Sequence, residues 1–192
     1  MPAGVRAEFV KMRRLAPLVD FGSEMVQSRN SIVVAQRTGE LDVKYRAGGL
    51  LVAMIGPVCL ALWRSKPTPE LFEVQRSLLH AAVARQPGKT AFLCVVEPKA
   101  EPPDEAERKA SAQMITSQGE NLAGVACVIE GNGFRAAITR TVLSGVVFMI
   151  RTPSPIKLFD GVRLAAPWLA RWVGRSALPD LEREVERGRA LL

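Results

Sequence analysis

A glycine-rich turn is the feature of this 192-residue chain that is best suited to bind an anion. Gly131-Asn132-Gly133 follows an apolar run directly and precedes a stretch with helical periodicity. Backbone amides at such a helix N-terminus, together with the helix dipole, favour a phosphate or a carboxylate. Arg135 and Arg140 add positive charge nearby. The spacing is neither GxGxxG nor GxxxxGK[ST], so a tight strand-to-helix turn that needs glycine is the simpler explanation.

Side chains for acid–base, nucleophilic or metal chemistry are few and scattered. The single histidine, His80, lies among apolar residues of an expected helix, and no GxSxG elbow is present. Cys59, Cys94 and Cys127 are separated by more than thirty residues each time, so no four-ligand zinc site is expected. Their apolar surroundings predict buried thiols, and their odd number favours a reducing compartment such as the cytoplasm. We therefore expect no metal, no cofactor and no enzymatic activity.

Positive charge is concentrated in one segment. The formal net charge is +7, and residues 131–176 carry seven cations against Asp160 alone. Those cations are Arg135, Arg140, Arg151, Lys157, Arg163, Arg171 and Arg175. The segment can attract an acidic protein surface, a phosphate group or an anionic membrane surface, although a solvated face that keeps the chain soluble is the simpler explanation. Nucleic acid is not expected, because no aromatic residues suited to base stacking alternate with these cations.

Two further groups have structural explanations beside functional ones. Trp168 and Trp172 lie one helical turn apart, which favours packing against a sheet, whereas an exposed pair would anchor a partner protein. The acidic residues between Glu97 and Glu107 fit a solvated helix start better than a pair of catalytic carboxylates.

The longest uncharged stretch, residues 47–63, predicts two strands rather than a membrane helix. It has 17 residues, fewer than the roughly 20 that span a bilayer, and glycines and Pro57 interrupt it. Leu50–Ile55 and Val58–Trp63 are the expected strands, joined by a turn at Gly56-Pro57. Met1–Leu15 lacks the apolar run of a secretory signal. We expect no stable membrane insertion.

The remaining pattern alternates helices and strands. Helices are expected over 69–85, capped by Thr68, and over 104–117, 134–149 and 162–173. Pro167 either kinks the last of these helices or marks its start. Strands are expected over 91–96, 122–129 and 156–159. This order predicts an α/β domain over 47–176, with a mixed four- to five-stranded sheet opened by a hairpin and about four helices. Residues 1–46 form a basic extension, partly disordered or with a short hairpin around the strand-like patch at 32–35, and residues 177–192 a C-terminal helix.

From about residue 49 to 174, this order of elements resembles the STAS family, the anti-sigma-factor antagonist-like domains. It is most similar to divergent bacterial members with a Phe-x-x-x-x-x-Ala-x-x-Trp-Leu pattern, here Phe159, Ala165, Trp168 and Leu169. The resemblance implies a non-enzymatic signalling module. Many members are switched by phosphorylation of a serine in the loop before the second helix. The corresponding loop here, residues 96–104, contains neither serine nor threonine, so no phosphorylation site is carried over.

We therefore expect a cytoplasmic interaction module that meets an acidic partner surface through Arg135, Arg140, Arg151 and Lys157. The alternative is a domain that binds a small anion or a lipid head group at the Gly131–Gly133 turn. An enzyme whose site assembles only in three dimensions is a third hypothesis, and the oligomeric state is left open. All three depend on a hairpin, not a continuous helix, at residues 47–63.

Overall fold

The computed structural model describes residues 40–175 and 180–192, apart from the side chains of residues 134–136 and 149. The expected strand-like patch at 32–35 lies outside the described residues. Every described element belongs to one compact unit, Gln36–Leu192. The strands are β1 (Leu41–Ala47), β2 (Leu50–Ile55), β3 (Val58–Trp63), β4 (Thr90–Val96), β5 (Leu122–Ile129) and β6 (Ile156–Phe159). The helices are α1 (Pro69–Arg85), α2 (Glu105–Thr116), the 3-10 turn η2 (Gly119–Asn121), α3 (Phe134–Met149), α4 (Val162–Val173) and α5 (Leu181–Leu191).

The six strands form one mixed sheet in the order β1-β2-β3-β4-β5-β6. β1, β2 and β3 are antiparallel neighbours, and β3 to β6 run parallel. The expected hairpin of β2 and β3 is confirmed, with Gly56 at a φ of 55° in its turn. The expected number of four to five strands was too low, because Leu41–Ala47, which we had placed in the extension, pairs with β2 as an additional edge strand.

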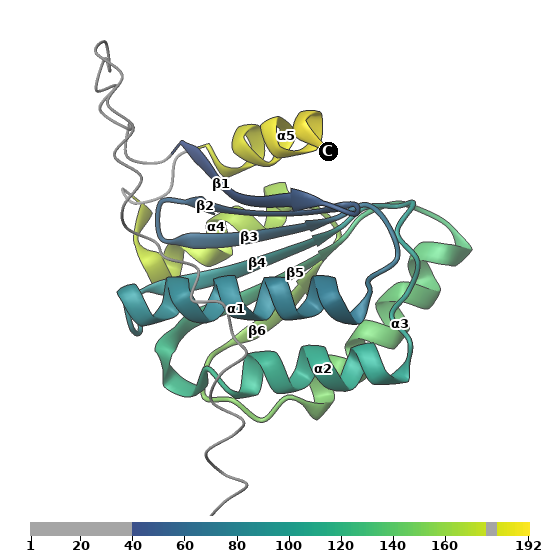
Figure 1. Ribbon diagram of the computed structural model, residues 1–192, viewed down its shortest axis with the longest axis horizontal. Helices are drawn as coiled ribbons and strands as arrows, with labels where there is room; N and C mark the ends of the chain where they lie inside the picture. Colours follow the sequence, from purple (N-terminus) through teal and green to yellow (C-terminus); the bar gives the residue numbers. More distant parts are fainter. Residues whose placement is uncertain (1–39, 176–179) are drawn as a thin grey trace, which may run out of the picture. The chain divides into compact units, whose positions relative to one another are not determined.

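Helices cover both faces of the sheet (Figure 1). Alternate side chains of β2, β3, β4 and β5 enter two separate cores. One core packs under α4 and α5, and includes Leu51, Leu60 and Leu93. The other packs under α1, α2 and α3, and includes Phe92 and Val125. Double coverage explains why these strands are apolar throughout instead of alternating.

The expected cap of α1 is confirmed, and α2 begins one residue later than expected. Thr68 caps α1, where its hydroxyl accepts a hydrogen bond from the Leu71 amide, and Pro69 is the first helical residue. Asp104 and Glu107 form a reciprocal capping box at α2. Pro167 lies inside α4. Among the described helices, none has both the length and the apolar character needed to cross a membrane.

The C-terminal helix α5 is fastened to the first strand by a buried carboxylate. Glu184 is fully buried, accepts a hydrogen bond of 3.0 Å from the Leu41 amide, and forms ion pairs with Arg183 and Arg187. Leu181 and Val185 of the same helix enter the core beneath. This arrangement closes the face of the sheet formed by β1 and β2.

Glu184→Ala is therefore expected to lower the free energy of unfolding by about 1–3 kcal/mol, because the partly buried Leu41 amide loses its acceptor. Urea denaturation followed by circular dichroism measures this change. The control Glu182→Ala removes an exposed carboxylate from the same helix and should change the free energy by less than about 0.5 kcal/mol. Equal effects of the two substitutions would show that the buried contact contributes nothing.

Candidate functional site

The Gly131–Gly133 turn is required by the backbone and by close packing. It connects β5 to α3, and Gly133 precedes the first helical residue with a φ of 90° and no capping side chain. Gly131 has a φ of 97°, and a Cβ there would lie 3.0 Å from the Cβ of Pro98. Both glycines thus occupy conformations that other residues rarely adopt. The geometry accounts for the motif without a ligand.

Arg140 is held by the protein itself. Its Nη2 donates to the carbonyl oxygens of Ile129 (3.2 Å) and Gly131 (2.9 Å), and its Nε lies 3.0 Å from Oδ1 of Asp160. The guanidinium therefore ties the turn after β5 to the end of β6. Only part of its charge remains available to a ligand.

The other expected cations do not form one cluster. The side chain of Arg135 lies outside the described residues. Arg151 is exposed beyond the opposite end of α3, and the helix from Arg140 to Met149 alone spans about 13 Å. Lys157 is exposed on β6, with its Nζ 5.3 Å from the ring centre of Phe159. The structure thus brings Arg140 and Lys157 together and leaves Arg151 apart.

A hollow of about 440 Å³ lies along β6 between α3 and α4, and we call it the β6 hollow. Arg140 and Ser144 of α3 form one side, and Leu164 of α4 contributes to the other. The remaining lining residues are Ile129, Lys157, Leu158, Phe159 and Asp160. The hollow is therefore mixed in character, with two cations, one carboxylate and several apolar side chains.

The tryptophans of α4 divide into a packed residue and an exposed one. Trp168 contacts Phe159 with ring centres 5.6 Å apart, and it contacts Trp172 at 6.1 Å. Gly124 of β5 makes room for both indoles, since a Cβ there would lie 3.3 Å from Cδ1 of Trp172. Even so, Trp172 is 46% exposed. Packing in the core was the expected role of both tryptophans, and it applies to Trp168 only.

A mixed apolar and cationic surface runs along α4 and continues onto β6. Leu164 is 52% exposed, and Arg171, seven residues further on, lies on the same side of the helix. Together with Lys157 and Trp172 they form what we call the β6–α4 surface. Sequence analysis did not single out Leu164 or Arg171 as site residues. The spacing of Leu164, Trp168 and Trp172 was visible, but which side of the helix stays uncovered depends on the sheet.

The carboxyl edge of the parallel strands, where open α/β sheets usually bind ligands, is filled by side chains of the chain itself. Glu97, which follows β4, receives two hydrogen bonds from Arg64, at 2.7 and 3.0 Å. These bonds raise the pKa of the Arg64 guanidinium. Arg189 of α5 pairs with Glu130, which follows β5, and lies 3.9 Å from Glu97. Glu97 is thus engaged in a structural ion-pair network, not in a catalytic carboxylate pair.

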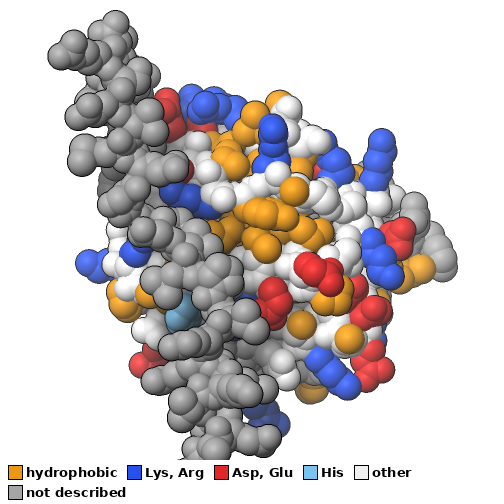
Figure 2. All heavy atoms as spheres, in the orientation of Figure 1, with side chains coloured by type: hydrophobic (Ala, Val, Ile, Leu, Met, Phe, Trp, Pro, Cys, Tyr) orange, Lys and Arg blue, Asp and Glu red, His pale blue; other side chains and the backbone are white. Residues whose placement is uncertain are grey.

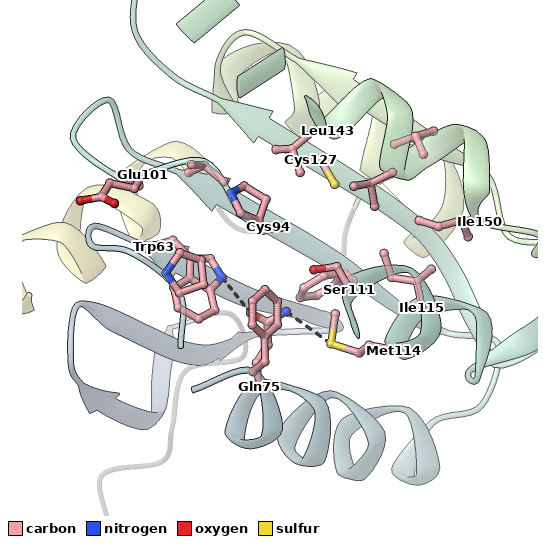
Figure 3. Close-up of a pocket in the computed structure, with 18 residues that line it drawn as sticks. Trp63, Gln75, Cys94, Glu101, Ser111, Met114, Ile115, Cys127, Leu143 and Ile150 are labelled. Carbon is pink, nitrogen blue, oxygen red and sulfur yellow. Dashed lines mark hydrogen bonds between the residues drawn. The ribbon is translucent and has the colours of Figure 1, made fainter. Parts of the chain in front are cut away.

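A small apolar cavity of about 70 Å³ lies between the sheet and α1, α2 and α3 (Figure 3). Gln75 provides its most buried polar side chain, which accepts a hydrogen bond from Trp63 Nε1 at 2.8 Å and donates to Met114 Sδ at 3.4 Å. Sites for drug-sized ligands usually have volumes of about 300–1,000 Å³. This cavity is smaller than the usual site of that kind.

Two cysteines face this cavity from neighbouring strands. Cys94 of β4 and Cys127 of β5 are register partners. Burial raises the pKa of Cys127 to about 12 and the pKa of Cys94 well above its usual value, and burial also raises the pKa of Cys59 to about 12. Because the thiolate is the reactive form, these thiols are poor nucleophiles at neutral pH.

The described residues offer no other catalytic constellation. His80 is exposed on α1, and the hydroxyl of Ser144 donates to the Arg140 carbonyl within α3. No group of three or more metal-ligating side chains occurs in ranges 40–175 and 180–192.

Filling the cavity is expected to stabilise the domain. Cys127→Met places additional apolar atoms in the void and should raise the free energy of unfolding by about 0.5–2 kcal/mol. Cys59→Met is the matched control, because Cys59 is buried on β3 but does not line the cavity, so overpacking should cost about 1–3 kcal/mol. Chemical denaturation of both variants measures the two changes, and a loss of stability in Cys127→Met would contradict the expectation.

No protein-family model matches the chain, and no curated protein matches it significantly. A solved structure that is similar to it is an uncharacterised protein of the DUF3478 family with a SpoIIAA-like fold, from Shewanella loihica PV-4. The match covers 68% of this chain and 94% of that one, at 18% identity and a TM-score of 0.40. This neighbour has the fold of the family that the sequence resembles, the SpoIIAA-like or STAS fold.

Proposed function

We propose that the domain is a non-catalytic binding module of STAS-like type that contacts an acidic partner protein through the β6–α4 surface. The observation that carries this proposal is the exposure of Leu164 and Trp172 beside Lys157 and Arg171 on a helix whose opposite side is buried. Apolar anchors surrounded by charge are typical of protein interfaces, where tryptophan and arginine are the residues most often decisive for affinity.

The positive charge of the β6–α4 surface favours an acidic partner. Arg163, Arg171 and Arg175 are exposed on or just after α4, together with Lys157 on β6, and Asp160 is the one acidic side chain among residues 131–175. The face that carries α1 and α2 shows acidic and basic side chains intermixed (Figure 2). A surface of one sign attracts a partner of the opposite sign and suppresses unsuitable ones. The sequence-based hypothesis placed the contact at Arg135, Arg140, Arg151 and Lys157. The present proposal keeps Lys157 and replaces the three arginines with residues of α4.

A binding role without catalysis agrees with the chemistry of the described side chains. The thiols are protonated, the single histidine is exposed, and the carboxylates after β4 and β5 are paired with arginines. Three free thiols also favour a reducing compartment, and we place the protein in the cytoplasm. A signalling role follows from the resemblance to STAS domains.

Reversing charge on the β6–α4 surface is expected to abolish partner binding. Lys157→Glu combined with Arg171→Glu should remove any protein that the full-length wild-type chain retains in a pull-down with mass spectrometry, because attraction becomes repulsion. Trp172→Ala should weaken retention at least tenfold, as expected for an interface anchor. Raising the salt to about 0.5 M should also reduce retention of the wild type.

The control makes the same change of charge elsewhere. Arg85→Glu combined with Lys89→Glu reverses two exposed cations at the end of α1 and just beyond it, and should retain the same proteins as the wild type. If both double variants lose the same proteins, net charge rather than the β6–α4 surface is responsible, and the proposal fails.

A small anionic ligand in the β6 hollow is the second candidate function. The hollow places Lys157 and Arg140 together, and its volume of about 440 Å³ is in the range of ligand sites. A phosphate-bearing molecule or a lipid head group would be the ligand class. Asp160 opposes this role because its carboxylate lines the same space.

The second candidate predicts stabilisation by ligand. Thermal unfolding is measured with inorganic phosphate, nucleotides and soluble phospholipid head-group analogues, and a ligand of the folded state should raise the midpoint in proportion to the logarithm of its concentration. Lys157→Glu should cancel the increase. An unchanged midpoint with all three probes would reject a small-anion site.

A further inference from the structure

The two edges of the sheet differ in how well they are protected. β1 forms one edge, where a register shift between Val43 and Tyr45 and an ion pair between Asp42 and Lys44 interrupt the strand. Bulges and charged side chains of this kind protect an edge from pairing with another strand. β6 forms the other edge, and its pairing with β5 has no register shift. Within residues 40–175 and 180–192, no strand lies beyond β6.

The backbone of β6 presents alternate residues to each side. Val125 of β5 pairs with Ile156, and its amide donates to the Pro155 carbonyl. In a parallel ladder this register directs the amides of Lys157 and Phe159 toward β5, so the amide and carbonyl groups of Ile156 and Leu158 point outward. These outward groups are free to pair with an added strand.

The β6 hollow lies along this edge and provides space for an added chain. Residues 157–160 line the hollow together with side chains of α3 and α4 on either side. An extended peptide fits such a groove, because its backbone can follow the strand while its alternate side chains turn toward the two helices. A folded surface would reach the edge less well between the two helices.

The charges around the β6 hollow favour an acidic peptide. Lys157 lies on the α4 side of β6, where it contacts Phe159, and Arg140 enters the hollow from α3. The N-terminus of α4 begins beside the hollow, and Gly161 caps it without any side-chain hydrogen bond, so the positive end of the helix dipole adds to the attraction. Asp160 also lines the hollow, but its carboxylate is paired with Arg140, so the two cations and one carboxylate of the hollow leave a net positive charge for the carboxylates of a peptide strand.

We propose that β6 accepts an extended acidic segment of the partner protein as a seventh strand of the sheet, seated in the β6 hollow. This inference rests on the proposed function and specifies its mode of binding. Main-chain hydrogen bonds to Ile156 and Leu158 supply affinity, and Lys157 and Arg140 supply the preference for glutamate and aspartate. Leu164 lines the hollow beside the added strand, and Trp172, outside the hollow, remains available to the folded part of the same partner.

The test uses a library of random dodecapeptides displayed on phage, selected against the full-length protein. Selected sequences are expected to be enriched in Asp and Glu at alternate positions and to lack proline in the paired stretch. Binding of synthetic versions should shift the amide resonances of Ile156 and Leu158 in NMR spectra. Failure to enrich acidic sequences would overturn the proposal.

Two substitutions at one position separate backbone pairing from side-chain contact. Leu158→Pro removes the outward amide without touching the ladder to β5, a position where an edge strand tolerates proline. It should weaken selected peptides by about tenfold or more, in line with the loss of a backbone hydrogen bond and the obstruction of its neighbours. Leu158→Ala loses the same side chain but keeps the amide, and should bind within about threefold of the wild type. Circular dichroism and thermal unfolding verify that both variants fold.

The outcomes distinguish this inference from the proposed function. Equal binding of peptide by Leu158→Pro and Leu158→Ala overturns strand addition. If the charge reversal at Lys157 and Arg171 still abolishes capture of the partner in that case, the β6–α4 surface stands without strand addition. If charge reversal has no effect on either peptide or partner, both the inference and the function on which it rests are wrong.

Discussion

Burial of the sheet on both faces is the constraint on which the rest of this structure depends. β2 to β5 supply apolar side chains to a core on each face, and five helices cover the two cores. Neither face of these strands is open to a ligand, so recognition is restricted to the sheet edges, the carboxyl ends of the strands and the outer sides of helices. Of these places, the carboxyl ends are closed by the ion pairs among Arg64, Glu97, Glu130 and Arg189. The sheet edges and the outer sides of the helices remain, and the proposed contacts use the edge at β6 and the outer side of α4.

This closure also separates the domain from the phosphorylation chemistry common among STAS domains. The loop after β4 has no hydroxyl side chain. Its first and last residues, Glu97 and Asp104, make contacts that stabilise the fold. Glu97 binds Arg64, and Asp104 caps α2. In the described residues, the loop thus stabilises the fold at the position where the STAS domains that the sequence resembles carry their switch.

Much of the fold could be predicted because its signals are local. Gly56-Pro57 between two apolar runs and Thr68-Pro69 before α1 each depend on nearby backbone groups, and both are found as expected. β1 was missed although its partner β2 follows across the Gly48-Gly49 turn, because its alternating charged residues resemble a solvated extension more than a strand of the core sheet. The site was less predictable still. Charge counting could not show that Arg140 pairs with Asp160 and binds two carbonyl oxygens, nor that α3 holds Arg151 away from it.

The bond between Leu41 and Glu184 joins residues 143 positions apart in the chain. During translation, β1 and β2 emerge long before α5. The leucines on the side of the sheet that α5 covers are therefore exposed during most of synthesis. Closure of this face therefore comes late in synthesis, and long-range closure of this kind is slow and leaves an aggregation-prone surface in the meantime. A nascent chain stalled before residue 181 would be a natural client for a chaperone that recognises exposed aliphatic side chains.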